Sequence, residues 1–353
     1  MIRNDVQVAP FLSVLVPCRN EARFLAGCLE SILANDYPVN RMEVLVIDGV
    51  SSDDTSHVIE KFSARDARIR YLKNPSQTAP HALNLGIQEA RGVVIARVDA
   101  HATVAVNYFS RCVARLEETG ADNVGGAMRT VAQDQGFWSE PILAALGHRF
   151  GVGNSYFRVG SSEARWVDTV FGGCWRRSVF TRVGVFNPLL RRSQDMEFSL
   201  RLKAAGLRTL LAPDIHCDYY ARTRLGSFVR HNFLNGEWAI LPFAFSTVIP
   251  VSLRHLIPLV FVVALAGCVL AASWSIVPLQ WVGLSYLTVN AMASMQIAAR
   301  KQRPIMVIFM PVVFSLLHVS YGFGSLSGLF KTIGIFCRGR QKQLQENLCM
   351  PQQ

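Results

Sequence analysis

Acidic and imidazole side chains stand directly after short apolar runs in the first third of the chain. Asp48 and Asp99 each end such a run, and His101 follows two positions after Asp99. Side chains two apart in extended backbone share a face, so Asp99 and His101 could bind one divalent cation, which would screen a diphosphate. Ser51 and Asp53 follow Asp48, and these carboxylates and hydroxyls suit a pyrimidine imide and a ribose. Taken alone, each segment also fits a solvated polar turn.

The elements that must position these residues alternate between strand and helix. Strand-like apolar runs occupy 12–16, 43–47, 69–72 and 93–98, and helical periodicity covers 21–34, the segment after Asp53, and 82–90. This alternation predicts an α/β domain with a largely parallel sheet and helices on both faces. Such sheets bind ligands at the carboxyl ends of their strands, where Asp48 and Asp99 stand.

The composition changes to that of a membrane protein after about residue 225. Three apolar runs, near 256–273, 281–299 and 305–328, approach the ~20 residues needed to cross hydrocarbon. We therefore predict a globular domain over 1–225, a juxtamembrane segment over 226–253, a transmembrane region over 254–336 and a basic tail over 337–353. If all three runs crossed the membrane, the basic tail would lie outside the cell, against the positive-inside rule. If the third run were re-entrant, the tail would return to the cytoplasm. The sequence leaves both topologies open.

Charge and cysteine content exclude several classes of protein. The net charge is +11, and from Arg254 onward eight basic residues accompany one acidic residue, which indicates a cytoplasmic membrane face rather than nucleic-acid binding. The eight cysteines form no CxxC pair and no zinc spacing, so we expect free thiols in a reducing compartment. No GxGxxG follows the first strand, which argues against an NAD enzyme. Asp5 and Gln7 interrupt any signal-peptide core, so we expect the first domain to be cytoplasmic.

Five separated motifs, in order along the chain, favour one family. They are VLVPCRNEARFLAGCLESI, VLVIDGVSSDDT, ALNLGIQEARGVVIARVDAH, FGGCWRRSVFTRVGVF and QDMEFSLRLKAAG. From about Phe11 to Trp238 the chain resembles the family 2 glycosyltransferases, which have the GT-A fold. The motif RVDAH and the C-terminal HVSYGFGSLSGL are most similar to the ExoA-type glucosyltransferases of succinoglycan and related exopolysaccharide biosynthesis.

The resemblance implies roles for residues on the donor side. The residues that would bind the nucleotide sugar are Pro17, Arg19, Glu21, Asp48, Ser51, Asp53 and Asp99, with Asp48 reading uracil. Asp99 and His101 occupy the family's DxD position, which holds Mn²⁺ or Mg²⁺ on the diphosphate. Histidine as the second ligand is a departure from the family pattern, and imidazole suits Mn²⁺ better than Mg²⁺.

The resemblance also implies roles on the acceptor side. Asp195 falls on the family's general base, although Gln194 replaces the preceding glutamate and a plain helix cap is the alternative. The residues expected at the acceptor or the diphosphate are Gly172, Gly173, Trp175, Arg230, His231 and Trp238. The QxxRW motif of processive synthases is absent, and an anionic-lipid patch is the alternative for the basic members of this set.

The expected protein is a membrane-anchored, inverting, metal-dependent hexosyltransferase at the inner membrane, with its catalytic domain in the cytoplasm. It would transfer a hexose, expected to be glucose, from a UDP-sugar to a lipid-linked saccharide, alongside other exopolysaccharide assembly proteins. The alternatives are a polyprenyl-phosphate glycosyltransferase, a processive synthase and a catalytically silent scaffold. A helical apolar stripe between Phe137 and Phe150 is expected to be core, with a lipid-facing or acceptor-facing role as the alternative.

Overall fold

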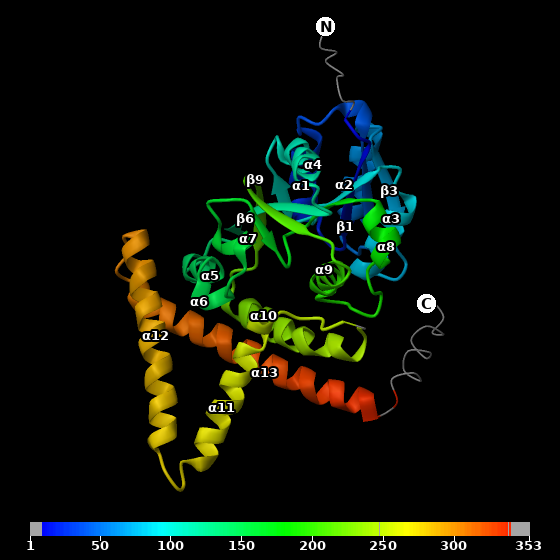
Figure 1. Ribbon diagram of the computed structural model, residues 1–353. Coiled ribbons are helices and arrows are strands. Elements are labelled where there is room, and N and C mark those ends of the chain that lie inside the picture. The colour runs from blue at the N-terminus through cyan, green and yellow to red at the C-terminus, as the bar shows by residue number, and fades with distance from the viewer. Residues whose placement is uncertain (1–8, 247, 338, 340–353) are drawn as a thin grey trace. The chain divides into compact units, whose positions relative to one another are not determined.

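The computed structural model describes residues 9–246, 248–337 and 339, and its contacts divide the chain into two compact units (Figure 1). Among these residues the first unit comprises 9–129 and 160–219, and the second comprises 130–159 and 220–339. Asp5, Gln7 and the basic tail beyond Gly339 lie outside the described residues.

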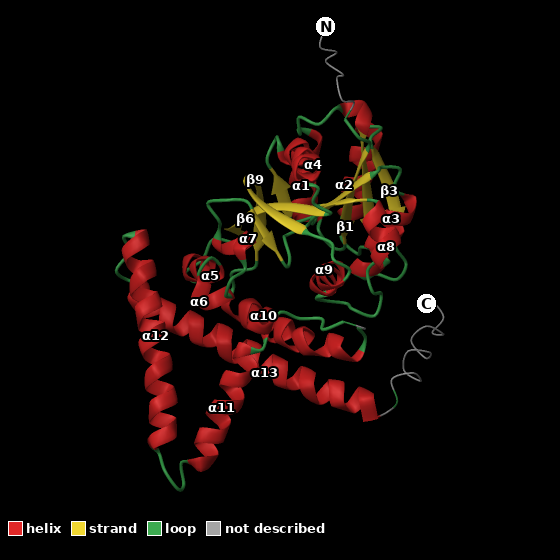
Figure 2. Ribbon diagram, in the orientation of Figure 1, coloured by secondary structure: helices red, strands yellow, loops and turns green. Residues whose placement is uncertain are grey.

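A mixed sheet with strand order β3-β2-β1-β4-β8-β6-β9-β5 forms the frame of the first unit, and β7 pairs with β9 (Figure 2). Its first strands are parallel: β1 (Leu12–Cys18), β2 (Met42–Asp48), β3 (Ile69–Lys73) and β4 (Val94–Arg97). The helices between them are α1 (Ala22–Leu33), α2 (Thr55–Arg65) and α3 (Ala79–Glu89). The predicted strand and helix alternation is therefore confirmed, to within a few residues at each end.

Antiparallel strands from later in the chain complete the sheet. They are β5 (Ala102–Val104), β6 (Asn123–Ala132), β7 (Arg165–Val167), β8 (Cys174–Arg176) and β9 (Thr209–Ala221). The remaining helices of this unit are α4 (Tyr108–Thr119), α8 (Ser178–Val183) and α9 (Gln194–Ala204). Because β8 pairs with β4, the loop that precedes β8 lies beside the carboxyl end of β4.

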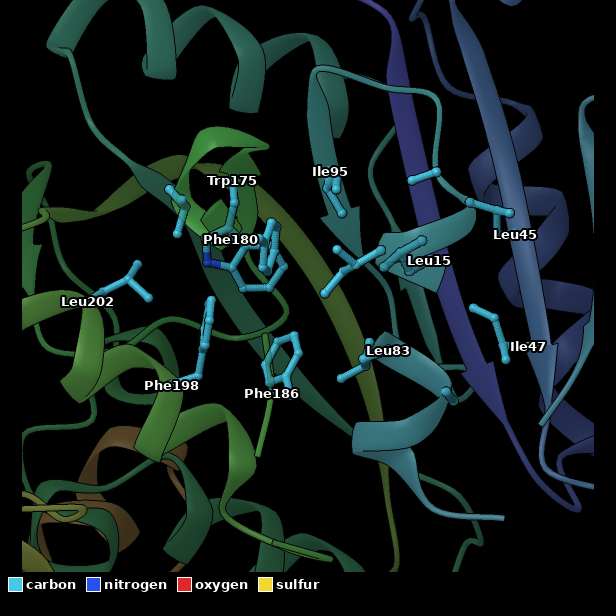
Figure 3. Close-up of a cluster of buried hydrophobic side chains, with 14 of the residues drawn as sticks. Leu15, Leu45, Ile47, Leu83, Ile95, Trp175, Phe180, Phe186, Phe198 and Leu202 are labelled. Atoms are coloured by element: carbon cyan, nitrogen blue, oxygen red, sulfur yellow. The ribbon is translucent and has the colours of Figure 1, made fainter. Parts of the chain in front are cut away.

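An aromatic cluster joins the parallel strands to α9 (Figure 3). Leu15, Leu45 and Ile47 line one side, and Phe198 of α9 lies in the same cluster. Trp175 is 4% exposed, and its ring contacts those of Phe180, Phe186 and Phe198 edge-on. The expectation that Trp175 faces the acceptor is therefore corrected: apolar burial makes this side chain part of the core that anchors α9.

The second unit consists of helices. These are α5 (Ser139–Leu146), α6 (Arg149–Val152), α7 (Tyr156–Val159), α10 (Leu225–Ile240), α11 (Ile257–Ala271), α12 (Val277–Lys301) and α13 (Met306–Cys337), with short 3-10 turns at 241–244 and 253–255. Ile142 and Ala145 of α5 are buried against Phe314 of α13, so the stripe that contains Ile142 is core, as expected. This packing places 130–159 with the C-terminal helices rather than within the domain predicted over 1–225.

Two of the described helices are long and apolar enough to cross a membrane. One is Leu253–Ala271, which contains α11, and the other is α13. The second predicted apolar run forms α12, a helix of 25 residues that is less apolar than these two. The third run is one unbroken helix of 32 residues, so its glycines do not produce the helix break of a re-entrant loop.

Candidate functional site

Two loops at the carboxyl ends of β1 and β2 are joined by hydrogen bonds. The Asn20 N–H donates to Ser51 Oγ at 2.9 Å, and the Ser52 N–H donates to Asn20 Oδ1 at 2.8 Å. Asn20 has φ +56°, a left-handed conformation that asparagine tolerates better than most residues. The Glu21 N–H donates to Thr55 Oγ1 at 2.8 Å. These contacts fix the two loops that contain Arg19, Glu21 and Ser51 relative to one another.

Asp53 links the starts of two helices. One carboxylate oxygen accepts from the Thr55 N–H at 3.1 Å, and the other accepts from the Ala22 N–H at 3.2 Å. Burial opposes ionisation, but the hydrogen bonds from Thr55 and Ala22 outweigh it and lower the pKa of the Asp53 carboxyl. Asp53 is thus a structural link between the two loops that contain the predicted nucleotide-binding residues.

Asp48 ends β2 as a buried carboxylate with local hydroxyl partners. Its side chain accepts from Ser51 Oγ at 2.5 Å, from the Ser51 N–H at 3.2 Å and from the Tyr71 hydroxyl at 3.4 Å. Tyr71 comes from β3 and was not among the predicted site residues. Burial and the negative charge of Asp48 raise the pKa of Tyr71, so this hydroxyl stays protonated and remains a donor to Asp48.

Arg97, at the end of β4, forms an ion pair with Asp99. Its Nε lies 2.8 Å from Asp99 Oδ1, and the residue is only 9% exposed. Burial disfavours the charged guanidinium, but Asp99 and then Asp195 favour it more strongly, so the pKa of Arg97 is raised. Arg97 is therefore a buried cation whose charge is favoured by two of the predicted functional carboxylates, and sequence reasoning missed it because it sits inside a strand run.

Gly172 and Gly173 let the loop before β8 pass against β4. The Arg97 N–H donates to the Gly173 carbonyl at 3.0 Å. Gly172 has φ +66°, and a Cβ there would lie 2.7 Å from the Arg97 carbonyl oxygen, so only glycine fits both the conformation and the space. The two predicted glycines thus hold the backbone of Arg97 in place.

His101 lies between the first loop and β9. Its Nδ1 is 3.0 Å from Glu21 Oε1, and its ring contacts Tyr219 edge-on with centroids 4.9 Å apart. Glu21 was expected in the nucleotide pocket and His101 at the metal. The structure brings the two into direct contact, an arrangement that orients an imidazole in many metal sites.

Asp195 stands exposed in the first turn of α9. Its Oδ1 accepts from the Met196 N–H at 2.9 Å, and it follows Ser193, which has the left-handed φ of +57°. The neighbouring Gln194 is buried, and its Oε1 has no hydrogen-bond partner among the described residues. Glu197, two positions on, is buried in an ion pair of 2.8 Å with Arg201. Asp195 is thus the acidic residue of this turn that faces solvent.

The other candidates have different surroundings. Pro17 is half-buried in β1, and Arg19 is exposed at the first loop. On α10 of the second unit, Arg230 and His231 are exposed and Trp238 is half-buried.

Two buried thiols lie near the predicted site. Burial is the main cause that raises the pKa of Cys18 and of Cys28, and the negative charge of a nearby carboxylate, Asp48 for Cys18 and Asp99 for Cys28, raises each pKa further. These thiols therefore stay protonated and are inert rather than nucleophilic.

Asp99 and His101 offer one carboxylate and one imidazole, two ligand types that suit Mn²⁺. Within the described part of the chain, no three His, Cys, Asp or Glu residues gather as a complete metal site. Two protein ligands fit a cation whose other positions are taken by substrate phosphate and water.

Three comparisons relate this chain to known proteins. Residues 13–184 match the family described as "Glycosyl transferase family 2". The succinoglycan biosynthesis protein ExoA of Rhizobium meliloti is 29% identical over 269 residues, 75% of this chain and 80% of ExoA. A Methanococcus voltae relative, named dolichyl N-acetyl-alpha-D-glucosaminyl phosphate 3-beta-D-2,3-diacetamido-2,3-dideoxy-beta-D-glucuronosyltransferase, is 25% identical and covers 64% of this chain and 72% of its own.

A solved structure has the same fold. It is the mannosyltransferase PcManGT from Pyrobaculum calidifontis in complex with GDP-Man and Mn²⁺. Its TM-score is 0.59 at 17% sequence identity, over 92% of this chain and 88% of that one.

Proposed function

Because the chain belongs to glycosyltransferase family 2 and has the GT-A fold, we propose that it transfers a hexose from a UDP-sugar to a saccharide carried on a membrane lipid. The observation that carries this proposal is the charge arrangement at the strand ends. Arg97 is a buried cation whose charge is stabilised by Asp99 on the donor side and by Asp195 at an open helix start.

The donor nucleotide would lie against the two joined loops. Asp48 accepts the uracil imide N–H, and Ser51 holds that carboxylate in position through its 2.5 Å hydrogen bond. Pro17, Arg19 and Glu21 line the same pocket, and Asp53 keeps its two loops together. Glucose is the expected sugar, since the relative ExoA belongs to succinoglycan biosynthesis.

A divalent cation would be held by Asp99 and His101 together with the donor phosphates. When bound, it supplies positive charge that stabilises the leaving diphosphate. The 3.0 Å contact between Glu21 and His101 Nδ1 orients the ring so that its other nitrogen serves as the ligand atom. PcManGT contains Mn²⁺, which agrees with an imidazole in the ligand set.

Transfer is a single displacement with inversion. Asp195 accepts the proton of an acceptor hydroxyl, whose oxygen bonds to the anomeric carbon of the sugar. The bond from that carbon to the donor phosphate breaks, and UDP leaves with the electron pair. Gly172 and Gly173 shape the acceptor side of the site. No nucleophilic carboxylate on the opposite face is needed, because the acceptor takes the place that water has in inverting hydrolysis.

The acceptor would be presented at the membrane. Two long apolar helices in the C-terminal part indicate membrane association, and the Methanococcus voltae relative is named for a dolichyl-phosphate-linked acceptor. We place the catalytic domain on the cytoplasmic face of the inner membrane, where UDP-sugars are available. Arg230, His231 and Trp238 on α10 are proposed to contact the diphosphate or the lipid-linked acceptor.

The test is UDP release by the detergent-purified protein, with UDP-glucose, UDP-galactose and UDP-GlcNAc as donors and Mn²⁺, Mg²⁺ or EDTA in the buffer. Lipid extract from a polysaccharide-producing cell supplies the acceptor. We expect release with one donor that requires both metal and extract. Absence of UDP binding by calorimetry would overturn the nucleotide-site assignment and favour a catalytically silent scaffold.

A further inference from the structure

The second unit contains a long apolar surface formed by one helical hairpin. Residues 256–299 include no Asp, Glu, Lys, Arg or His, and they form α11, a short turn and α12. Large apolar side chains along this hairpin face outward, among them Val260, Leu270, Trp274, Trp281 and Leu284, each at least 63% exposed. The two arms touch where Phe261 stacks on Tyr286 with ring centroids 4.6 Å apart.

Helix α13 is equally apolar but is packed differently. Only 6% of the apolar window at Leu253–Ala271 is buried, against 44% of that in α13. The first half of α13 places Met310, Val313 and Phe314 in the core with α5. The neighbouring Glu140 of α5 pairs with Arg303 at 3.1 Å, so this packing lies next to the charged end of the hairpin.

The second half of α13 lies along α10 (Figure 1). A Cβ on Gly324 would be 1.9 Å from the Phe233 carbonyl oxygen, and one on Gly236 would be 2.0 Å from that of Tyr321. The two backbones are therefore in direct contact at glycines, as in closely packed membrane and interfacial helices. Gly324 and Gly328 of the third apolar run therefore allow the backbones of α13 and α10 to approach each other this closely.

A buried ion pair fixes the same helix pair. Glu237 of α10 is 7% exposed, and it accepts from Lys331 Nζ at 2.6 Å and from Ser327 Oγ at 2.9 Å. On the same helix α10, Arg230 and His231 are exposed. If this half of α13 crossed a bilayer, α10 and its charged groups would be drawn into hydrocarbon with it, at a cost of several kcal/mol for each charge.

We infer that the α11–α12 hairpin alone enters the lipid bilayer and that α13 stays at the membrane surface with α10. This inference rests on the membrane association proposed above. At about 1.5 Å per residue, the 19 residues of Leu253–Ala271 extend about 28 Å, close to the hydrocarbon thickness of about 30 Å. Arg254 at one end of the hairpin and Arg300 and Lys301 at the other remain on one side, as the positive-inside rule requires.

The hairpin has a direct consequence for the end of the chain. Because the hairpin enters and leaves the bilayer on the same side, α13 lies on the side of the catalytic domain. Cys337, at the end of α13, lies on that side too. Of the two topologies that the sequence leaves open, the one with three crossings would instead place the end of α13 on the opposite side.

Labelling with a membrane-impermeant maleimide tests this topology in sealed inverted vesicles and in intact spheroplasts. In a Cys268→Ser/Cys349→Ser variant, Cys337 is the exposed thiol, since the other described cysteines are buried. The matched reporter for the catalytic domain is Ser162→Cys in a variant that also carries Cys337→Ser; residue 162 is exposed in the first unit. We expect both sites to react in inverted vesicles and neither to react in spheroplasts.

A third variant, Ser275→Cys in a protein that also carries Cys268→Ser, Cys337→Ser and Cys349→Ser, reports on the hairpin turn and is expected not to react in inverted vesicles until detergent is added. Reaction of Cys337 from the spheroplast side, or only after detergent, would overturn the hairpin inference. Reaction of Ser275→Cys in inverted vesicles without detergent would do the same. A protein found in the soluble fraction would instead contradict the proposed membrane association.

Discussion

Arg97 and Asp99 form a 2.8 Å ion pair at the carboxyl end of β4, with the arginine almost fully buried. The pair leaves a fixed positive charge next to a carboxylate that we assign to the donor phosphates. Asp195, assigned as the base, also contributes to the raised pKa of Arg97. The charge of this guanidinium is thus favoured both by its partner Asp99 and by Asp195.

We predict that Arg97→Met lowers kcat/KM for UDP release at least tenfold at pH 7, because it removes the cation that pairs with Asp99 at the donor side of the site. Arg97→Lys keeps the charge and should lose less. The measurement is kcat/KM for UDP release by the two variants and by the unaltered protein. Equal losses in Arg97→Met and Arg97→Lys would contradict a role for the charge.

Gly172→Ala should reduce activity at least tenfold, since its Cβ would push on the Arg97 carbonyl oxygen and displace the site. Gly160→Ala is the matched control: Gly160 also has positive φ, at +85°, but no atom lies within 4 Å of the added Cβ. Both variants carry a backbone strain of about 1 kcal/mol, and only Gly172→Ala adds the close contact with Arg97, so Gly160→Ala shows the effect of the strain alone. Equal activities in the two variants would contradict the assigned role of Gly172.

Asp48→Asn should weaken UDP binding about 10- to 100-fold, the loss expected when a hydrogen bond to a charged acceptor is removed. Calorimetry with UDP in the presence of Mn²⁺ measures it directly. Glu60→Gln on α2 removes an exposed carboxylate from the same unit and should bind UDP as the unaltered protein does. Unchanged affinity in Asp48→Asn would place the uracil elsewhere.

Much of the parallel half of the sheet could be predicted from local sequence. The apolar run that ends in Asp48 is a strand that ends there, and the run before Asp99 is a strand that ends at Arg97, two residues earlier. The helices between these strands have the expected periodicity. Local signals predict such elements because each strand is buried on both faces and each helix on one. The loop contacts between Asn20 and Ser51 follow from the same topology.

Contacts between distant segments could not be predicted in this way. In the sequence, Arg97 interrupts an apolar strand, and its partner Gly173 lies in the loop before β8, 76 residues later. Trp175 occurs in an acceptor-facing motif, but its burial depends on Phe180, Phe186 and Phe198, which only the fold brings together. The packing of α5 on α13 is likewise long-range, and no local pattern assigns 130–159 to the second unit.

The stability of the first unit should depend on pH through Glu43. This buried carboxylate accepts from Ser13 Oγ at 2.7 Å, from the Arg91 N–H at 2.7 Å and from Arg70 at 2.9 Å. Burial opposes ionisation, but the hydrogen bonds from Ser13, Arg91 and Arg70 outweigh it and lower the pKa of Glu43.

A lowered folded-state pKa means that this stabilisation is complete above the ordinary glutamate value of about 4.3 and is lost as pH falls through the folded value. Glu43→Gln should therefore lower the free energy of unfolding by about 1–3 kcal/mol at pH 7, and the difference should shrink below pH 4. Chemical unfolding of the two proteins at a series of pH values measures this. A difference that stays constant down to pH 3 would contradict the assignment.

The central claim is that Asp195 removes the acceptor proton in a UDP-sugar transfer. Asp195→Asn keeps the shape and the hydrogen bond from Met196, while Glu60→Gln serves as the control. UDP binding and UDP release are measured on both variants with the donor and metal that support turnover. We predict that Asp195→Asn binds UDP normally and loses release at least a hundredfold, while Glu60→Gln retains both. Release by Asp195→Asn within threefold of the unaltered protein would contradict the account.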